Sequence, residues 1–125
     1  MKKAITVLLL IFVNISLAFE NLSAKDFYNL INKEKGILIL DVRTPQEYRE
    51  DGHIPGSVLI PIQILPQYIK ELDKFRDKKI LVYCRSGNRS VVASKFLEQN
   101  GFKYVYNLKG GIIEWKKFNL PIEYR

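Results

Sequence analysis

Short apolar runs alternate with helical patterns along this chain, and that alternation restricts the fold more than any other feature of the sequence. Ile37–Leu40 and Ile80–Tyr83 are continuous apolar runs, as expected for strands that are covered on both faces. Ser23 and Thr44 are suited to cap the starts of helices, and a further helical pattern begins at Val91. Strands that alternate with helices join through right-handed crossovers into mostly parallel sheets. The sequence therefore predicts an α/β fold in which helices flank a central, mostly parallel sheet.

Shorter patterns predict the remaining elements of a single domain. Ser57–Ile60 and Tyr104–Tyr106 are short apolar segments, and Gly110–Gly111 opens a last helix. Apolar residues recur at helical spacing over residues 68–75, which predicts a helix there. The sequence contains no repeat or low-complexity stretch, and 125 residues are too few for more than one domain of ordinary size.

The first 18 residues have the pattern of a secretory signal peptide. Met1–Lys3 is positively charged, Ala4–Val13 is apolar apart from one threonine, and Ser16–Ala18 matches a small-residue cleavage site. Because the apolar run is shorter than the ~20 residues that span a bilayer, a retained membrane anchor is the weaker interpretation. We therefore expect a signal peptide at residues 1–18 and one domain at residues 19–125. The protein is expected to be periplasmic or secreted, without stable membrane insertion after cleavage.

Charge and composition exclude several kinds of partner. Loss of residues 1–18 lowers the formal net charge from +7 to +5, and the remaining lysines are spread along the chain rather than clustered. This pattern is not that of a dedicated nucleic-acid surface, and it favours small anions as partners. One cysteine and one histidine are too few for a metal site built from these residue types. No metal or cofactor is expected.

Cys84 is the only cysteine, and it stands between a predicted strand and a predicted helix. Unpaired N–H groups and the positive end of the helix dipole favour a thiolate at such a position. In an open parallel sheet, ligands bind at the carboxyl ends of the strands, where Cys84 and Asp41 are both expected. A buried and unreactive thiol is the alternative, because free cysteine is among the most buried residue types. The charged loop that follows Cys84 favours a nucleophile.

The segment from Cys84 to Arg89 is a six-residue loop that suits the binding of an anion. Gly87 permits a tight curl that turns backbone N–H groups inward, and Arg85 and Arg89 offer guanidinium donors to an oxyanion. Ser90 is expected to cap the helix that follows. The expected substrate-binding residues are Arg85, Ser86, Gly87, Asn88 and Arg89.

Four ordered motifs after the predicted cleavage site resemble the signatures of rhodanese domains. They are Asp41–Tyr48, Gly52–Ser57, Tyr83–Ser90, and Gly110–Gly111 followed by Trp115. The resemblance extends over essentially all of residues 19–125 and is close to single-domain thiosulfate sulfurtransferases exported to the periplasm. It implies a small α/β domain whose loop cysteine takes a sulfane sulfur from a small anionic donor. The cysteine would hold that sulfur as a persulfide and pass it to a thiophilic acceptor such as cyanide or a thiol.

Residues outside the loop are expected to support it. Asp41 and Arg43 end the first covered strand and are predicted to brace the neighbouring loops. Arg43 and Glu47 also have the spacing of an ion pair on one helix face. His53 lies in a turn motif of the family, which implies a structural role rather than catalysis. Trp115 is expected to pack in the core or at its rim.

Two other functions are compatible with the same residues. Cysteine phosphatases and arsenate reductases of related folds hold a tetrahedral oxyanion in a similar loop. That loop is one residue longer between cysteine and arginine, and Ser90 stands here where the arginine would fall. A noncatalytic sulfur carrier or binding module would use the same cysteine with little turnover of small molecules. The loop length favours sulfur transfer over phosphoryl transfer, and the carrier stays open.

Overall fold

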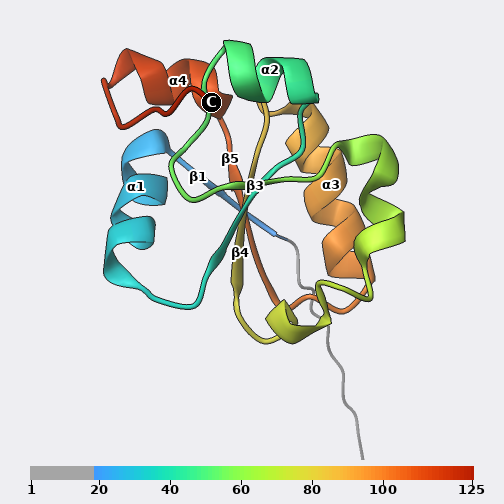
Figure 1. Cartoon of the computed structure of the whole chain (residues 1–125). Coiled ribbons are helices and arrows are strands. Elements are labelled where there is room, and N and C mark those ends of the chain that lie inside the picture. The colour runs from blue at the N-terminus through green and yellow to red at the C-terminus, as the bar shows by residue number, and fades with distance from the viewer. Residues whose placement is uncertain (1–18) are drawn as a thin grey trace, which may run out of the picture.

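A five-stranded parallel sheet forms the centre of the computed structural model, which describes residues 19–125 (Figure 1). Its strands are β1 (Glu20–Leu22), β2 (Leu38–Asp41), β3 (Val58–Leu59), β4 (Lys79–Tyr83) and β5 (Tyr104–Leu108). They lie in the order β1-β5-β4-β2-β3, and every neighbouring pair is parallel. The predicted α/β fold is confirmed. The signal peptide predicted at residues 1–18 lies outside the described residues.

Helices cover both faces of this sheet (Figure 1). The α-helices are α1 (Ala24–Lys33), α2 (Pro45–Glu50), α3 (Asn88–Gln99) and α4 (Gly111–Lys117), and the 3-10 helices are η1 (Ile62–Tyr68) and η2 (Asp73–Phe75). Helices α1 and α4 pack together on one face, whereas α3 and η1 pack together on the other. None of the helices in residues 19–125 is long and apolar enough to cross a membrane.

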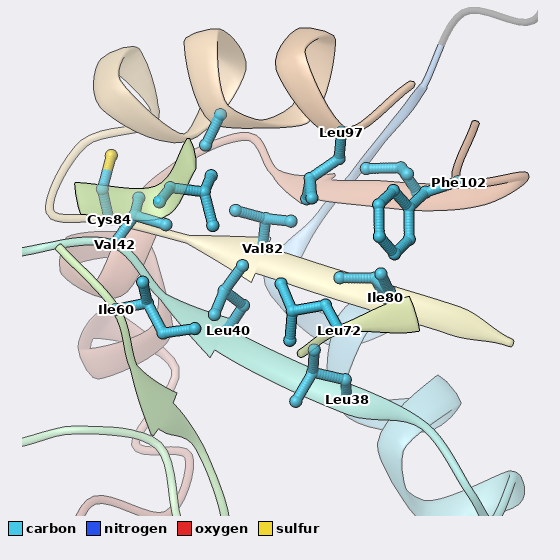
Figure 2. Packing of buried hydrophobic residues seen from close by; sticks show 13 residues of the cluster. Leu38, Leu40, Val42, Ile60, Leu72, Ile80, Val82, Cys84, Leu97 and Phe102 are labelled. Atoms are coloured by element: carbon cyan, nitrogen blue, oxygen red, sulfur yellow. The ribbon is translucent and has the colours of Figure 1, made fainter. Parts of the chain in front are cut away.

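Alternation along the strands determines which face each core side chain enters. Leu40, Val82 and Cys84 belong to the buried cluster on the α3 side, which Figure 2 shows from close by. Leu81 and Tyr83 point the other way and pack in the cluster that contains Trp115. The sulfur of Cys84 is therefore directed toward the first turn of α3.

The predicted helix starts at Ser23 and Thr44 are confirmed. The Ser23 hydroxyl accepts a hydrogen bond of 3.2 Å from the Asp26 N–H. Thr44 and Glu47 form a capping box in which each side chain bonds to the other residue's backbone N–H. Trp115 is buried, as expected, and its ring N–H donates to the carbonyl of Pro121 at 2.7 Å.

The predicted α-helix over residues 68–75 is wrong, since this region forms the two 3-10 helices and the turn between them. Tyr68 and Leu72 do face the core, as their spacing predicted. Pro66 lies inside η1, however, and proline has no N–H to donate to an α-helical ladder. Strand β1 was not predicted, because Glu20 and Asn21 leave it without an apolar pattern.

Candidate active site

The sulfur of Cys84 lies at the carboxyl end of β4 and is enclosed by the loop of residues 84–89, called here the Cys84 loop. Cys84 is only 1% exposed. Its Sγ accepts hydrogen bonds from the N–H groups of Gly87 at 3.1 Å and Ser90 at 3.3 Å. The thiol donates to Ser90 Oγ at 3.3 Å, and that hydroxyl donates in turn to the carbonyl of Gly87. The sulfur thus sits among donors that stabilise negative charge on it.

Gly87 determines where the helix after the loop begins. It adopts a left-handed conformation with φ of 103° and serves as the N-cap of α3, so the helix starts at Asn88. The expectation that Ser90 caps a helix beginning at Val91 is therefore wrong. Because the helix starts earlier, the N–H of Ser90 lies in its first turn and reaches the sulfur, and the positive end of the helix dipole lies beside Cys84.

The start of α4 forms the outer support of the Cys84 loop. The N–H of Ile112 donates to the carbonyl of Cys84 at 3.0 Å, and the N–H of Ile113 donates to that of Arg85 at 3.2 Å. These two carbonyls are thereby turned away from the sulfur. Contact is so close that a Cβ on Gly111 would lie 2.1 Å from the carbonyl oxygen of Arg85. Gly111 thus lets α4 approach the loop.

The two arginines of the loop have different surroundings. Arg89 forms a bidentate ion pair with Glu47 of α2, with both N–O distances at 2.8 Å. This guanidinium holds the pKa of Glu47 at about 2, and the same carboxylate raises the pKa of Arg89. Arg85 is exposed, and no ion pair among residues 19–125 includes it. Arg85 is therefore the guanidinium free to meet an anion, whereas Arg89 links the loop to α2.

Asp41 and Arg43 form a buried ion pair under the loops at the same end of the sheet. Both side chains are 0% exposed, and their closest N–O distance is 2.7 Å. Burial opposes the charge of Arg43, but the hydrogen bonds and the charge of Asp41 outweigh it and raise the pKa of Arg43. Arg43 also donates to the carbonyl of Gly52 at 2.8 Å. The predicted pair between Arg43 and Glu47 is wrong, because each has a nearer partner in the folded chain.

Tyr83, the strand residue before Cys84, connects the turn of residues 52–57 to β4, a role that sequence reasoning missed. Its hydroxyl accepts a 3.0 Å bond from the Ile54 N–H and lies 3.1 Å from Ser57 Oγ. Burial raises the pKa of Tyr83, so the hydroxyl is neutral. His53 is buried in the same turn and stacks on Tyr48, with its Nδ1 2.9 Å from the Tyr48 carbonyl. These contacts anchor the turn.

The remaining loop residues, Ser86 and Asn88, are exposed at the rim, as ordinary turn residues would be.

Glu47, Tyr83 and Gly111 were not predicted as parts of the site. The spacing to Arg43 did single out Glu47, but only as a partner within its own helix. No local pattern indicated that its carboxylate reaches Arg89, 42 residues away.

Comparison with known proteins places this site in a family. Residues 23–118 match the model of the rhodanese-like domain. A sulfurtransferase from Allochromatium vinosum is 43% identical over 86 residues, which make up 69% of this chain and 78% of that protein. A tRNA uridine(34) hydroxylase from Buchnera aphidicola is 35% identical over 102 residues, but the match covers 75% of this chain and only 32% of the hydroxylase.

Solved structures agree with this assignment. A rhodanese-related protein from Thermoplasma volcanium has a TM-score of 0.75 and 37% identity, with 86% of this chain and 100% of that chain covered. A thiosulfate sulfurtransferase from Pseudomonas aeruginosa also has a TM-score of 0.75, at 26% identity, with 85% of this chain and 20% of that chain covered. Sequence motifs, fold similarity and the family match agree, and this chain belongs to the rhodanese-like domain family.

Proposed function

We propose that this protein is a sulfurtransferase that carries a sulfane sulfur as a persulfide on Cys84. The donor in this proposal is thiosulfate or a similar small anion, and the acceptor is a thiophile such as cyanide or a thiol. The observation that carries the proposal is the enclosure of Sγ by the N–H groups of Gly87 and Ser90 and by the Ser90 hydroxyl. The similarity to a sulfurtransferase over most of that protein's length supports it.

The reaction consists of two nucleophilic displacements. The Cys84 thiolate attacks the outer sulfur of thiosulfate, a new S–S bond forms, and the S–S bond of thiosulfate breaks so that sulfite leaves with the electron pair. Cyanide or a thiolate then attacks the outer sulfur of the persulfide, and Cys84 leaves as a thiolate. No oxidant or reductant is needed, because each step exchanges one sulfur–sulfur bond for another bond to the same sulfur.

Backbone donors suit both charged states of the cysteine. They stabilise the thiolate before the reaction and the persulfide anion after it, without reorganising in between. His53 is not needed as a base, since its ring stacks on Tyr48 and its Nδ1 contacts the Tyr48 carbonyl. Asp41 is likewise engaged with Arg43. The exposed Arg85 attracts the anionic donor, and Arg89 holds the loop in shape through Glu47.

The loop supports phosphoryl transfer less well than sulfur transfer. Ser90 occupies the position at which a phosphatase arginine would fall, and its hydroxyl contacts the sulfur instead of a phosphate oxygen. Arg89, one residue earlier, directs its guanidinium to Glu47. A dianionic phosphoryl group would then lack the bidentate guanidinium that favours its binding.

Turnover of small molecules separates an enzyme from a noncatalytic carrier. We expect the purified domain to convert thiosulfate and cyanide to sulfite and thiocyanate in steady state, and Cys84→Ala to lose this activity. Equal rates for the two proteins would contradict the proposed enzyme. A single stoichiometric discharge without turnover would instead support the carrier.

Export through residues 1–18 is part of the proposal. Cleavage before Phe19 would leave every described element intact, because β1 begins at Glu20 and Phe19 packs against the core. In an oxidising compartment, a lone cysteine needs an outside acceptor to return from persulfide to thiolate. Sequencing the N-terminus of the exported protein tests this point, and a start elsewhere than at or near Phe19 would contradict it.

A further inference from the structure

An apolar groove runs between η1 and α3 on the face of the molecule that contains Cys84. It is lined by Ile62, Leu65, Pro66, Val92, Ala93 and Phe96. Val92 is 59% exposed, although single exposed apolar residues are common on protein surfaces. Here the exposed valine is continuous with the exposed Pro66 and the partly buried Ile62 and Phe96. The result is a contiguous apolar surface rather than an isolated side chain.

This groove is close to the reactive sulfur. Its floor residues Leu65 and Ala93 belong to the same buried cluster as Cys84. Val92 lies two residues after Ser90, whose N–H contacts the sulfur. It also lies one helical turn after Asn88, an exposed residue of the Cys84 loop and the first residue of α3. The groove therefore lies along the helix whose first turn contacts the sulfur.

Two exposed cations belong to α3 and to the loop that precedes it. Lys95 follows Val92 on the exposed side of α3, and Arg85 is exposed on the loop before it. Neither residue takes part in an ion pair among residues 19–125. Glu47 is neutralised by Arg89, and the helix rotation places Glu98 on a different side of α3 from Val92. A segment that docks an apolar side chain here therefore binds more tightly if carboxylates flank that side chain, because they attract Lys95 and Arg85.

We propose that this groove docks a polypeptide acceptor of the persulfide sulfur, namely a segment with an apolar side chain flanked by Asp or Glu and followed by a cysteine. The inference rests on the proposed sulfur transfer. The acceptor thiolate attacks the outer sulfur of the Cys84 persulfide, the S–S bond to Cys84 breaks, and Cys84 leaves as a thiolate. The persulfide is then on the acceptor, with electrons and charge conserved.

The reach of the acceptor follows from the geometry of α3. Val92 faces outward, whereas Cys84 lies under the first turn of the helix. The path between them is on the order of one helix diameter, ~10 Å. Extended chain covers this distance with about three residues between the apolar side chain and the cysteine.

A matched set of peptides tests the inference. The probe is a synthetic peptide with a leucine between two aspartates, a short Gly-Ser spacer and a cysteine, and the control peptide has lysines in place of the aspartates. The protein is loaded with thiosulfate, freed of excess donor, and mixed with either peptide or with cyanide. The variants are Val92→Ser and Tyr104→Ser. Tyr104 is a suitable control because it is 47% exposed at the opposite, amino end of the sheet.

We expect Val92→Ser to lower the transfer rate to the acidic peptide about tenfold, with transfer to cyanide unchanged and Tyr104→Ser indistinguishable from the wild type. The lysine peptide should react more slowly than the acidic one. Equal rates to the acidic peptide for wild type and Val92→Ser would overturn the inference.

Binding of the same peptide with serine in place of cysteine, measured by fluorescence anisotropy on the unloaded protein, gives a second readout. We expect Val92→Ser to weaken that binding by a similar factor, and unchanged binding would overturn the docking site. This measurement does not depend on loading. A failure of thiosulfate to load Cys84 would instead contradict the proposed function.

Discussion

The ion pair between Glu47 and Arg89 is expected to stabilise the protein, and Glu47→Gln removes the ion pair while keeping the size of the side chain. Glutamine keeps the shape of the side chain and can still accept the 3.0 Å hydrogen bond from the Thr44 N–H in the capping box. Of the two charge-assisted bonds to Arg89, each 2.8 Å, one is lost because an amide nitrogen cannot accept, and the other loses its ionic character. A change in stability then reports the contact between α2 and the Cys84 loop rather than the loss of a helix cap.

The size of the effect follows from the pKa of Glu47. Arg89 holds this pKa at about 2, against an ordinary value of 4.5. A tenfold change in a protonation equilibrium corresponds to about 1.4 kcal/mol, so the whole shift, to which Arg89 contributes most and the Thr44 hydrogen bonds also contribute, corresponds to about 3 kcal/mol before screening. Water reaches this pair, since the Arg89 side chain is 35% exposed and that of Glu47 is 18% exposed. Solvent screening reduces the expected loss to about 1 to 2 kcal/mol.

The pH dependence has a definite sign. The pKa of Glu47 is lower in the folded than in the unfolded chain, so the pair stabilises the protein fully above the ordinary pKa of 4.5, and this contribution is lost as the pH falls toward 2. Urea unfolding at a series of pH values from 7 down to 3 should show a difference between wild type and Glu47→Gln that shrinks markedly over the acid part of this range.

Glu50→Gln is the matched control, because Glu50 lies on the same helix and contacts Gln46 rather than a cation. Its unfolding free energy should stay within about 0.5 kcal/mol of the wild type. A loss for Glu47→Gln that does not change with pH, or an equal loss for both variants, would refute the reasoning.

Three further variants, with Gly56→Ala as a control for the first, test individual contacts of the site. Gly111→Ala should cost more than about 3 kcal/mol in urea unfolding, because its φ is +64° and its Cβ would meet the Arg85 carbonyl at 2.1 Å. Gly56→Ala, with φ of +83° but open space around it, should cost only about 1 kcal/mol. Arg85→Ala should raise the KM for thiosulfate about tenfold with little change in kcat, and an unchanged KM in steady-state kinetics would remove Arg85 from the site. Ser90→Ala should slow persulfide formation about fivefold in rapid-quench mass measurements, since the hydroxyl that accepts from the thiol at 3.3 Å can donate to the sulfur once the thiol has lost its proton. An unchanged rate would assign that hydroxyl to structure alone.

The parts of the fold that depend on local chemistry were predictable from the sequence. The Thr44 and Ser23 caps need only residues three positions apart, and both form as predicted. The position of Cys84 at a strand end followed from the apolar run before it and the polar loop after it. These signals are contained within a few neighbouring residues, so the sequence expresses them directly.

The parts that depend on tertiary packing were not predictable in the same way. The spacing of Arg43 and Glu47 suggested a local pair, but in the folded chain Glu47 pairs with Arg89, a residue of another helix. The early start of α3 depends on the left-handed conformation of Gly87, which lies so close to the Lys109 carbonyl that a Cβ would approach it to 2.3 Å. Both features require elements from distant parts of the chain to be in place.

Intact mass spectrometry after incubation with thiosulfate tests the central claim, that Cys84 becomes a persulfide, most directly. Purified protein comprising residues 19–125 should gain the mass of one sulfur atom and lose it again on addition of cyanide. Peptide mapping should place the added sulfur on Cys84, and Cys84→Ser should gain nothing. An unchanged mass for the wild-type protein, or equal gain by Cys84→Ser, would contradict sulfur transfer through this cysteine.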